Sequence, residues 1–182
     1  MWDAMGVSRA MKRHLEELFR EVPLPTGRDP HQLFRAICAY LSESSGREVR
    51  LMLEPFPPGT VSGLWLDLGD HEVVAVEKNT LPMHQMVILG HELWHRKERH
   101  SGVPGSEAGA AAAARTLGDR WSLSDAANHV AARTEYSMAE ERRAERFGRL
   151  LAAKFHPLLL GKDDCTTPSE DLVGRIWASL RS

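Results

Sequence analysis

Residues 91–95 read His-Glu-Leu-Trp-His, and this pentapeptide constrains the chain more than any other stretch. On an α-helix, positions four residues apart lie on the same face, so the imidazoles of His91 and His95 can reach one divalent metal ion. Glu92 then lies beside the open coordination position, where it can take a proton from a bound water. The motif therefore predicts a helix that carries two metal ligands and a catalytic base.

The sequence around the motif supports a helix over residues 82–99. Pro82 suits a first helical turn, and the apolar residues between positions 86 and 93 supply a helix body. The alternative is a surface helix with two unpaired histidines. At this length and composition, a chance match to the motif is expected in only roughly one sequence in twenty-five. We therefore favour the metal-binding interpretation.

Two histidines leave a catalytic zinc site one protein ligand short. In metzincins the third ligand is a histidine ten residues after the first, but that position holds Ser101, and His100 is one residue out of place. The sequence therefore excludes the metzincin arrangement.

In gluzincins the third ligand is a glutamate on a later helix, with an acid or amide four residues further on as the partner of a ligand histidine. Glu141 and Glu145 fit this form and share one helix face. The small residues Ala144 and Gly148 would let their helix approach the metal-binding helix closely. The stretch is rich in acids that could simply be solvated, and two of them are alternative ligands: Glu140 and Glu135.

The rest of the chain predicts an α+β fold. The first helical segment carries His14, which we expect at the surface, and the second begins with Asp29 as cap and Pro30 as first helical residue. Three strand candidates follow: Glu48–Glu54, Val61–Leu68 and His71–Glu77. Their short connections favour a meander. We therefore expect a small antiparallel three-stranded sheet packed against a helical, zincin-like core.

We expect one metallopeptidase-like domain over residues 1–182, since no linker demands a second one. Its predicted segments are the N-terminal helices 5–43, the sheet 47–77, the metal-binding helix 82–99, a Gly/Ala-rich excursion 101–123, the third-ligand helix 138–155 and a C-terminal helix 168–180.

Composition narrows the function further. The formal net charge of -2 offers no basic field that would by itself indicate nucleic-acid binding, and no convincing DNA-reading helix is present. There is no secretion signal and no apolar run of the length that spans a bilayer. We therefore expect a cytoplasmic protein without membrane contact, in which Cys38 and Cys165 are unpaired thiols.

Two stretches resemble the ImmA/IrrE family of small metallo-endopeptidases: the run EKNTLPMHQMVILGHELWH, and E-x-x-A-E-x-F-G-x-L-L from Glu141 to Leu151. The resemblance implies a zinc-dependent peptidase with His91, His95 and Glu141 as ligands and Glu92 as catalytic base. Members of that family cleave or inactivate a helix-turn-helix transcriptional repressor, often in a toxin-antitoxin-like, mobile-element or stress-response setting.

The chain departs from the family pattern at three positions. Glu145 stands where Asn or Asp is usual, and as the partner of a ligand histidine it would have to retract its longer side chain. Gly148 replaces Ala. Trp94 replaces a small residue between the histidines, and we expect it to narrow the cleft. The long separation of His95 from Glu141 fits an inserted excursion.

Further cleft residues are less defined by the sequence. A tetrahedral transition state needs a hydrogen-bond donor beside the metal. Tyr136 is one candidate, the sequence does not select it over the other donors, and His84 is a candidate residue of the cleft wall. Other donors in the right part of the chain are His129, His100 and Arg133.

The leading hypothesis is a zinc endopeptidase that cleaves a helix-turn-helix repressor or antitoxin partner, which would make any DNA contact. One alternative is a catalytically weak or inactive zinc-binding regulatory module that acts by binding its partner. Another is a toxin component with a different target. The imidazole and carboxylate ligands favour Zn²⁺, although manganese or iron could occupy such a site.

Overall fold

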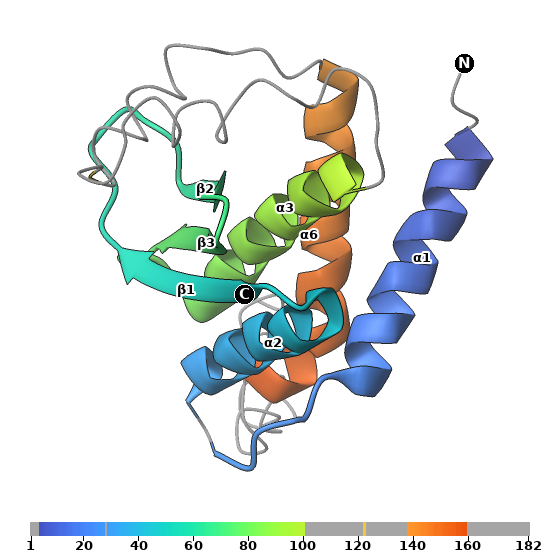
Figure 1. The fold of residues 1–182 in the computed structure, drawn as a ribbon, viewed down its shortest axis with the longest axis horizontal. Coiled ribbons are helices and arrows are strands. Elements are labelled where there is room, and N and C mark those ends of the chain that lie inside the picture. Colours follow the sequence, from blue (N-terminus) through green and yellow to red (C-terminus); the bar gives the residue numbers. More distant parts are fainter. Residues whose placement is uncertain (1–3, 28, 101–121, 123–137, 160–182) are drawn as a thin grey trace, which may run out of the picture.

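The computed structural model describes residues 4–27, 29–100, 122 and 138–159. Its elements are α1 (Ala4–Glu21), α2 (Pro30–Ser45), β1 (Glu48–Glu54), β2 (Gly63–Asp67), β3 (His71–Glu77), α3 (Pro82–His100) and α6 (Met138–Leu159) (Figure 1). The α+β class is therefore confirmed. The predicted helix 168–180 lies outside the described residues, as does the excursion 101–123 apart from Ser122.

The ends of α2 follow the capping residues in the sequence. The Asp29 carboxylate accepts a hydrogen bond of 2.9 Å from the main-chain N–H of His31, and Pro30 occupies the first turn. Gly46 ends the helix with a φ of 68°, a left-handed conformation that a glycine adopts without strain. Both predicted ends of this helix are confirmed.

The predicted antiparallel meander is wrong. The strand order is β1-β3-β2, with β1 parallel to β3 and β2 antiparallel to β3, so the sheet is mixed. β3 takes the central position because its five inner residues are all buried, whereas β1 is largely half-exposed. The connection 55–62 joins β1 to β2 by passing the end of β3. Strands on either side of a central strand are about 10 Å apart, and a connection of this length can span up to about 25 Å.

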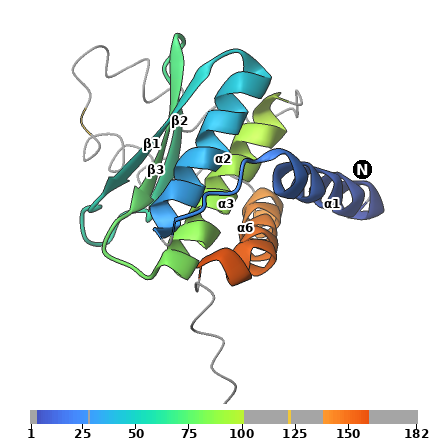
Figure 2. The ribbon, with the colours of Figure 1, turned by 90° about the horizontal axis from the view of Figure 1, so that it is seen from below.

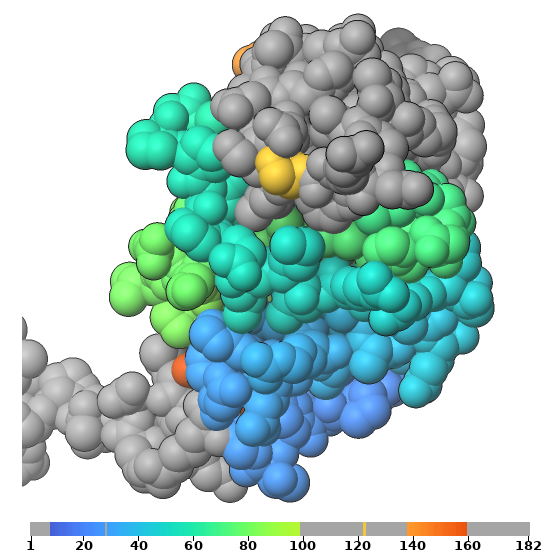
Figure 3. All heavy atoms as spheres, turned by 60° about the vertical axis from the view of Figure 1, so that its left-hand side comes forward, coloured from blue at the N-terminus to red at the C-terminus, as the bar shows by residue number. Residues whose placement is uncertain are grey.

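The helices lie in two layers on one face of the sheet. Figure 2 shows α2 and α3 beside the sheet and α6 and α1 beyond them. From another side, the blue surface of α2 packs directly under the cyan surface of β1 (Figure 3). Val49, Val74 and Val76 belong to the core that lies between the sheet and the helices. Among the described residues no helix has the length and apolar content to cross a bilayer.

His14 is not at the surface as predicted. Its side chain is only 6% exposed, and its ring stacks on Phe147 of α6 with 5.5 Å between centroids. Burial lowers the pKa of this imidazole, although its contact with Glu17 acts in the opposite direction. The aromatic ring therefore serves the packing of α1 on α6.

A buried ionic cluster joins the sheet to α3. Glu72 of β3 is fully buried, and its carboxylate accepts two hydrogen bonds from the Arg96 guanidinium, at 2.7 and 3.1 Å. The indole N–H of Trp65 donates to the same carboxylate at 2.8 Å. Arg96 directly follows His95 on α3, so this cluster fixes α3 against the sheet.

Replacing Arg96 with Met would leave the buried Glu72 carboxylate without this charged partner. Removal of one member of a buried ion pair costs roughly 3–5 kcal/mol, so we expect urea unfolding to show a loss of that size. Arg50→Met is the control, because Arg50 and Glu48 form an exposed pair and the free energy of unfolding should hardly change. Equal losses in the two variants would contradict the assigned role of the cluster.

The thiol of Cys38 should be chemically silent in the folded protein. It is 3% exposed, and burial raises its pKa to about 12, so the reactive thiolate is scarce at neutral pH. In a Cys165→Ser background, we expect a disulfide reagent at pH 8 to modify Cys38 only after denaturation. Rapid modification of the native protein would contradict this placement.

Candidate metal site

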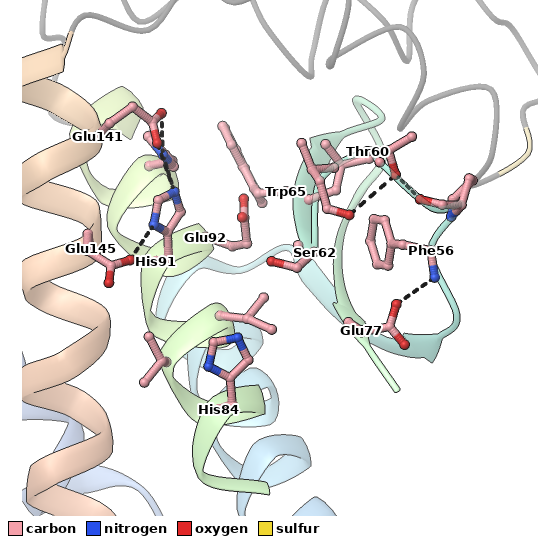
Figure 4. Close-up of a pocket in the computed structure, with 18 of the residues that line it drawn as sticks. Phe56, Thr60, Ser62, Trp65, Glu77, His84, His91, Glu92, Glu141 and Glu145 are labelled. Atoms are coloured by element: carbon pink, nitrogen blue, oxygen red, sulfur yellow. Dashed lines mark hydrogen bonds and ion pairs between the residues drawn. The ribbon is translucent and has the colours of Figure 1, made fainter. Parts of the chain in front are cut away.

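α3 brings the two motif histidines together as the helical spacing predicts. The Nε2 atoms of His91 and His95 lie 3.0 Å apart, and Figure 4 shows the His91 ring between Glu141 and Glu145 of α6. His95 is 6% exposed, whereas His91 is half-buried at the edge of the cleft. The pair therefore presents two imidazole nitrogens to one point in space.

Glu141 of α6 completes a three-residue cluster. Its Oε2 lies 3.4 Å from His91 Nε2 and its Oε1 lies 3.4 Å from His95 Nε2. Ligand atoms at zinc distances of 2.0–2.1 Å form a tetrahedron with edges of about 3.3–3.4 Å. The two separations from the histidines to the Glu141 oxygens equal this edge, and the 3.0 Å between the two histidine nitrogens is a little shorter. His91, His95 and Glu141 could therefore hold one metal ion together.

The approach of α6 to α3 depends on two glycines. A Cβ atom added to Gly148 would overlap the main-chain oxygen of Val87 and lie 3.1 Å from the His91 nitrogen. A Cβ atom at Gly90 would lie 2.7 Å from the Gly148 Cα atom. The helix backbones are thus in direct contact one turn before the metal cluster, as predicted for Gly148. This contact brings Glu141 within reach of both histidines.

The electrostatics of the cluster reflect its close packing. Hydrogen bonds from His91 and His95 lower the pKa of Glu141 to about 2. Burial disfavours protonation of His91, but the bond to Glu141 and the negative charges around the ring outweigh it and raise the pKa. An ionised carboxylate beside two imidazoles is the ligand set that a divalent cation prefers.

Glu145 lies one turn beyond Glu141, beside the other nitrogen of His91. Its Oε2 is 3.8 Å from His91 Nδ1, which is longer than a hydrogen bond, and its Oε1 accepts bonds from Arg149. The Glu145 carboxylate therefore lies on the Nδ1 side of His91, but the hydrogen bonds that it accepts come from Arg149.

Glu92 points away from α6, toward β2 (Figure 4). It is 9% exposed, and burial raises the pKa of its carboxyl group against the lowering effect of the two histidines. The main-chain N–H of Trp65 donates to this carboxylate. The residue predicted as base is therefore held between the metal-binding helix and the sheet.

A cleft of about 710 Å³ opens beside the cluster. One wall is α3, where the exposed side chain of His84 lines the cleft. The other wall is the connection 55–62, which Glu77 holds by accepting a bond of 2.8 Å from the Phe56 N–H. The three candidate ligands and Glu92 thus line the same cleft.

The remaining predicted cleft residues have different outcomes. Trp94 does not narrow the cleft, because it is 3% exposed and packs on Phe147 in the core. Of the described acids on α6, Glu141 and not Glu140 joins the histidines. Four further candidates lie outside the described residues: Tyr136, His129, Arg133 and Glu135.

Sequence reasoning missed the contribution of the sheet to this site. The predicted strands Glu48–Glu54 and Val61–Leu68 leave residues 55–60 as a short connection without a role in the site, yet this stretch forms a wall of the cleft. Gly63 was included in a strand without a role, although a glycine inside a strand signals a close approach of another group. That signal was present in the sequence and could have indicated the contact with α3.

Comparisons with protein-family models, with curated proteins and with solved structures find no match to this chain. The fold and the site therefore define the protein as an α+β chain with a candidate His-His-Glu metal site. Assignment to a family rests on the two resembling stretches of sequence alone.

Replacing Gly148 with Ala tests the close crossing of the helices. The added methyl group must push α6 from α3, so we expect the free energy of unfolding to fall by about 1–3 kcal/mol and zinc affinity to fall about tenfold, which corresponds to ~1.4 kcal/mol. Calorimetric zinc titration and urea unfolding measure both. Ala153→Gly, at an exposed position of the same helix, should lower stability alone. Unchanged zinc affinity in Gly148→Ala would refute the assignment.

Proposed function

We propose that this protein is a zinc-dependent endopeptidase of the ImmA/IrrE type. The single observation that carries the proposal is the meeting of His91, His95 and Glu141 from two helices at separations suited to zinc. The spacing of the motif and the resemblance of two sequence stretches support the same class. Imidazole and carboxylate ligands favour zinc over harder cations.

The residues of the site have different roles in the proposed hydrolysis. Zinc held by His91, His95 and Glu141 would activate water for attack and polarise the peptide carbonyl. Glu92 takes the proton from the attacking water and returns it to the leaving amine. Burial raises the pKa of Glu92, which makes its carboxylate a better proton acceptor than that of an exposed glutamate.

The proposed substrate is a protein, a helix-turn-helix repressor or antitoxin. The cleft runs between α3 and the connection 55–62, and its lining combines apolar side chains such as Val87 and Ile88 with the polar cluster. An extended peptide segment matches this shape and chemistry better than a small polar metabolite does. The choice of a DNA-binding partner rests on the family resemblance.

A second candidate function is a zinc-binding module that acts by holding its partner without cutting it. The observation that favours it is the position of Glu145, which pairs with Arg149 and lies 3.8 Å from His91. A histidine ligand without a firm partner orients the metal less well and weakens catalysis. A toxin component with another cellular target would share the same zinc site.

Replacing Glu92 with Gln separates catalysis from binding. We expect the variant to keep its fold and one zinc ion per chain but to lose cleavage by about 10²–10⁴-fold, the contribution of a general base. The assay uses internally quenched peptides and the helix-turn-helix protein encoded in the neighbouring reading frame. His91→Ala is the control that should lose zinc as well. Unchanged biological activity in Glu92→Gln would favour the binding module and contradict the peptidase.

A further inference from the structure

In the part of the chain that the structure describes, β2 lies at the end of the sheet, and it contacts α3. In the antiparallel pair with β3, the bonds Glu77 N–H to Ser62 and Leu68 N–H to His71 mark the paired positions. Alternation along the ladder then turns the main-chain groups of Gly63 and Trp65 to the free edge. These two residues therefore present main-chain groups that β3 does not use.

One of these main-chain groups, the N–H of Trp65, binds Glu92, the proposed base. The Trp65 N–H donates to the Glu92 carboxylate, and Glu92 is almost wholly buried at this point. Figure 4 shows the Glu92 side chain directed at the start of β2, beside Ser62 and Trp65. The strand edge therefore fixes the position of a carboxylate that its own helix leaves free to rotate.

Gly63 supplies the room for this carboxylate. A Cβ atom there would lie 2.8 Å from Glu92 Oε1 and 3.1 Å from Glu92 Cγ, and it would overlap Cγ2 of Ile88. The φ of Gly63 is not positive, unlike those of Gly46, Gly59 and Gly69. The backbone conformation would therefore accept an alanine, and it is the lack of space beside Ile88 and Glu92 that excludes one.

The strand itself is anchored to the metal-binding helix. The Trp65 indole donates to Glu72, which in turn binds Arg96, the residue after His95. Trp65 thus contacts two carboxylates, one through its side chain and one through its main chain. The indole bond fixes β2 to β3, and the bonds between Glu72 and Arg96 fix β3 to α3, so the strand holds one position relative to the site.

We propose that β2 positions the catalytic base, with Gly63 and Trp65 as positioning residues for Glu92. This inference rests on the proposed function, in which Glu92 is the base. The Trp65 N–H orients the carboxylate, and the absence of a side chain at Gly63 keeps the space open. An alanine at position 63 displaces Glu92 from its place while the three metal ligands keep theirs.

Amide hydrogen exchange tests the geometry without any substrate. By NMR on the full chain, the free-edge amide of Trp65 should exchange slowly, and Gly63→Ala or Glu92→Ala should speed its exchange at least tenfold. The amides of Leu64 and Leu66 point to β3 and are the internal control, which should stay protected. A Trp65 amide that exchanges rapidly in the wild type, or is unaffected by both variants, overturns the proposal.

Kinetics test the consequence for catalysis. On the internally quenched peptide that the wild type cleaves fastest, Gly63→Ala should lower kcat by roughly 10- to 100-fold, a large part of the effect of a general base. Zinc affinity should stay within about twofold, since none of the three metal ligands lies beside the Gly63 Cβ position. KM should change less than kcat, because Gly63 lines the cleft but acts on the reaction through Glu92. A rise in KM with unchanged kcat would overturn the proposal.

A second substitution separates the two contacts of the added methyl group. Gly63→Ala with Ile88→Ala removes the overlap with Ile88 and keeps the one with Glu92, so stability should return while kcat stays low. It also serves if the single variant does not fold. Recovery of kcat in the double variant would assign the loss to Ile88 and refute the role of Gly63. If the wild type cleaves no peptide, the proposed function fails, and the exchange measurement still decides the positioning.

Discussion

The candidate site depends on the direct contact of two helix backbones. Where α3 and α6 cross, Gly90 and Gly148 leave no side chain between them, and the helices approach more closely than larger residues would permit. Glu141 lies two turns before Gly148 on α6, so this crossing sets the distances from its carboxylate to His91 and His95. A site whose ligands come from distant parts of a chain needs such a rigid contact, because a ligand displaced by an ångström no longer completes the tetrahedron.

The metal ligands were predictable because their signals are local. The His91 and His95 pair lies within two helical turns, and Glu141 could be chosen because Gly148 and Glu145 share its helix at fixed offsets. The capped ends of α2 were predictable for the same reason, since Asp29 and Gly46 act on their own backbone neighbours. The strand bounds Glu48–Glu54 and His71–Glu77 also match, as each strand is short and flanked by turns.

The strand order and the buried polar cluster were not predictable from such signals. The turn residues of 55–62 are compatible with a hairpin that pairs β1 with β2, and also with a connection that passes the end of a central β3. Only the burial of β3 on both faces decides between these two strand orders. The pairing of Glu72 with Arg96 joins residues on a strand and a helix whose register the sequence does not specify. His14 was misplaced because a histidine on an amphipathic helix looks polar until Phe147 covers it.

The central claim is that two imidazoles and one carboxylate bind a single metal ion. X-ray absorption at the zinc edge of the zinc-loaded protein measures this directly, because it reports the number and type of ligand atoms. The account predicts two imidazole nitrogens and oxygen ligands at about 2.0–2.2 Å, with a changed oxygen shell and weaker zinc retention in Glu141→Ala. A spectrum without imidazole ligands, or one identical in wild type and Glu141→Ala, would contradict it.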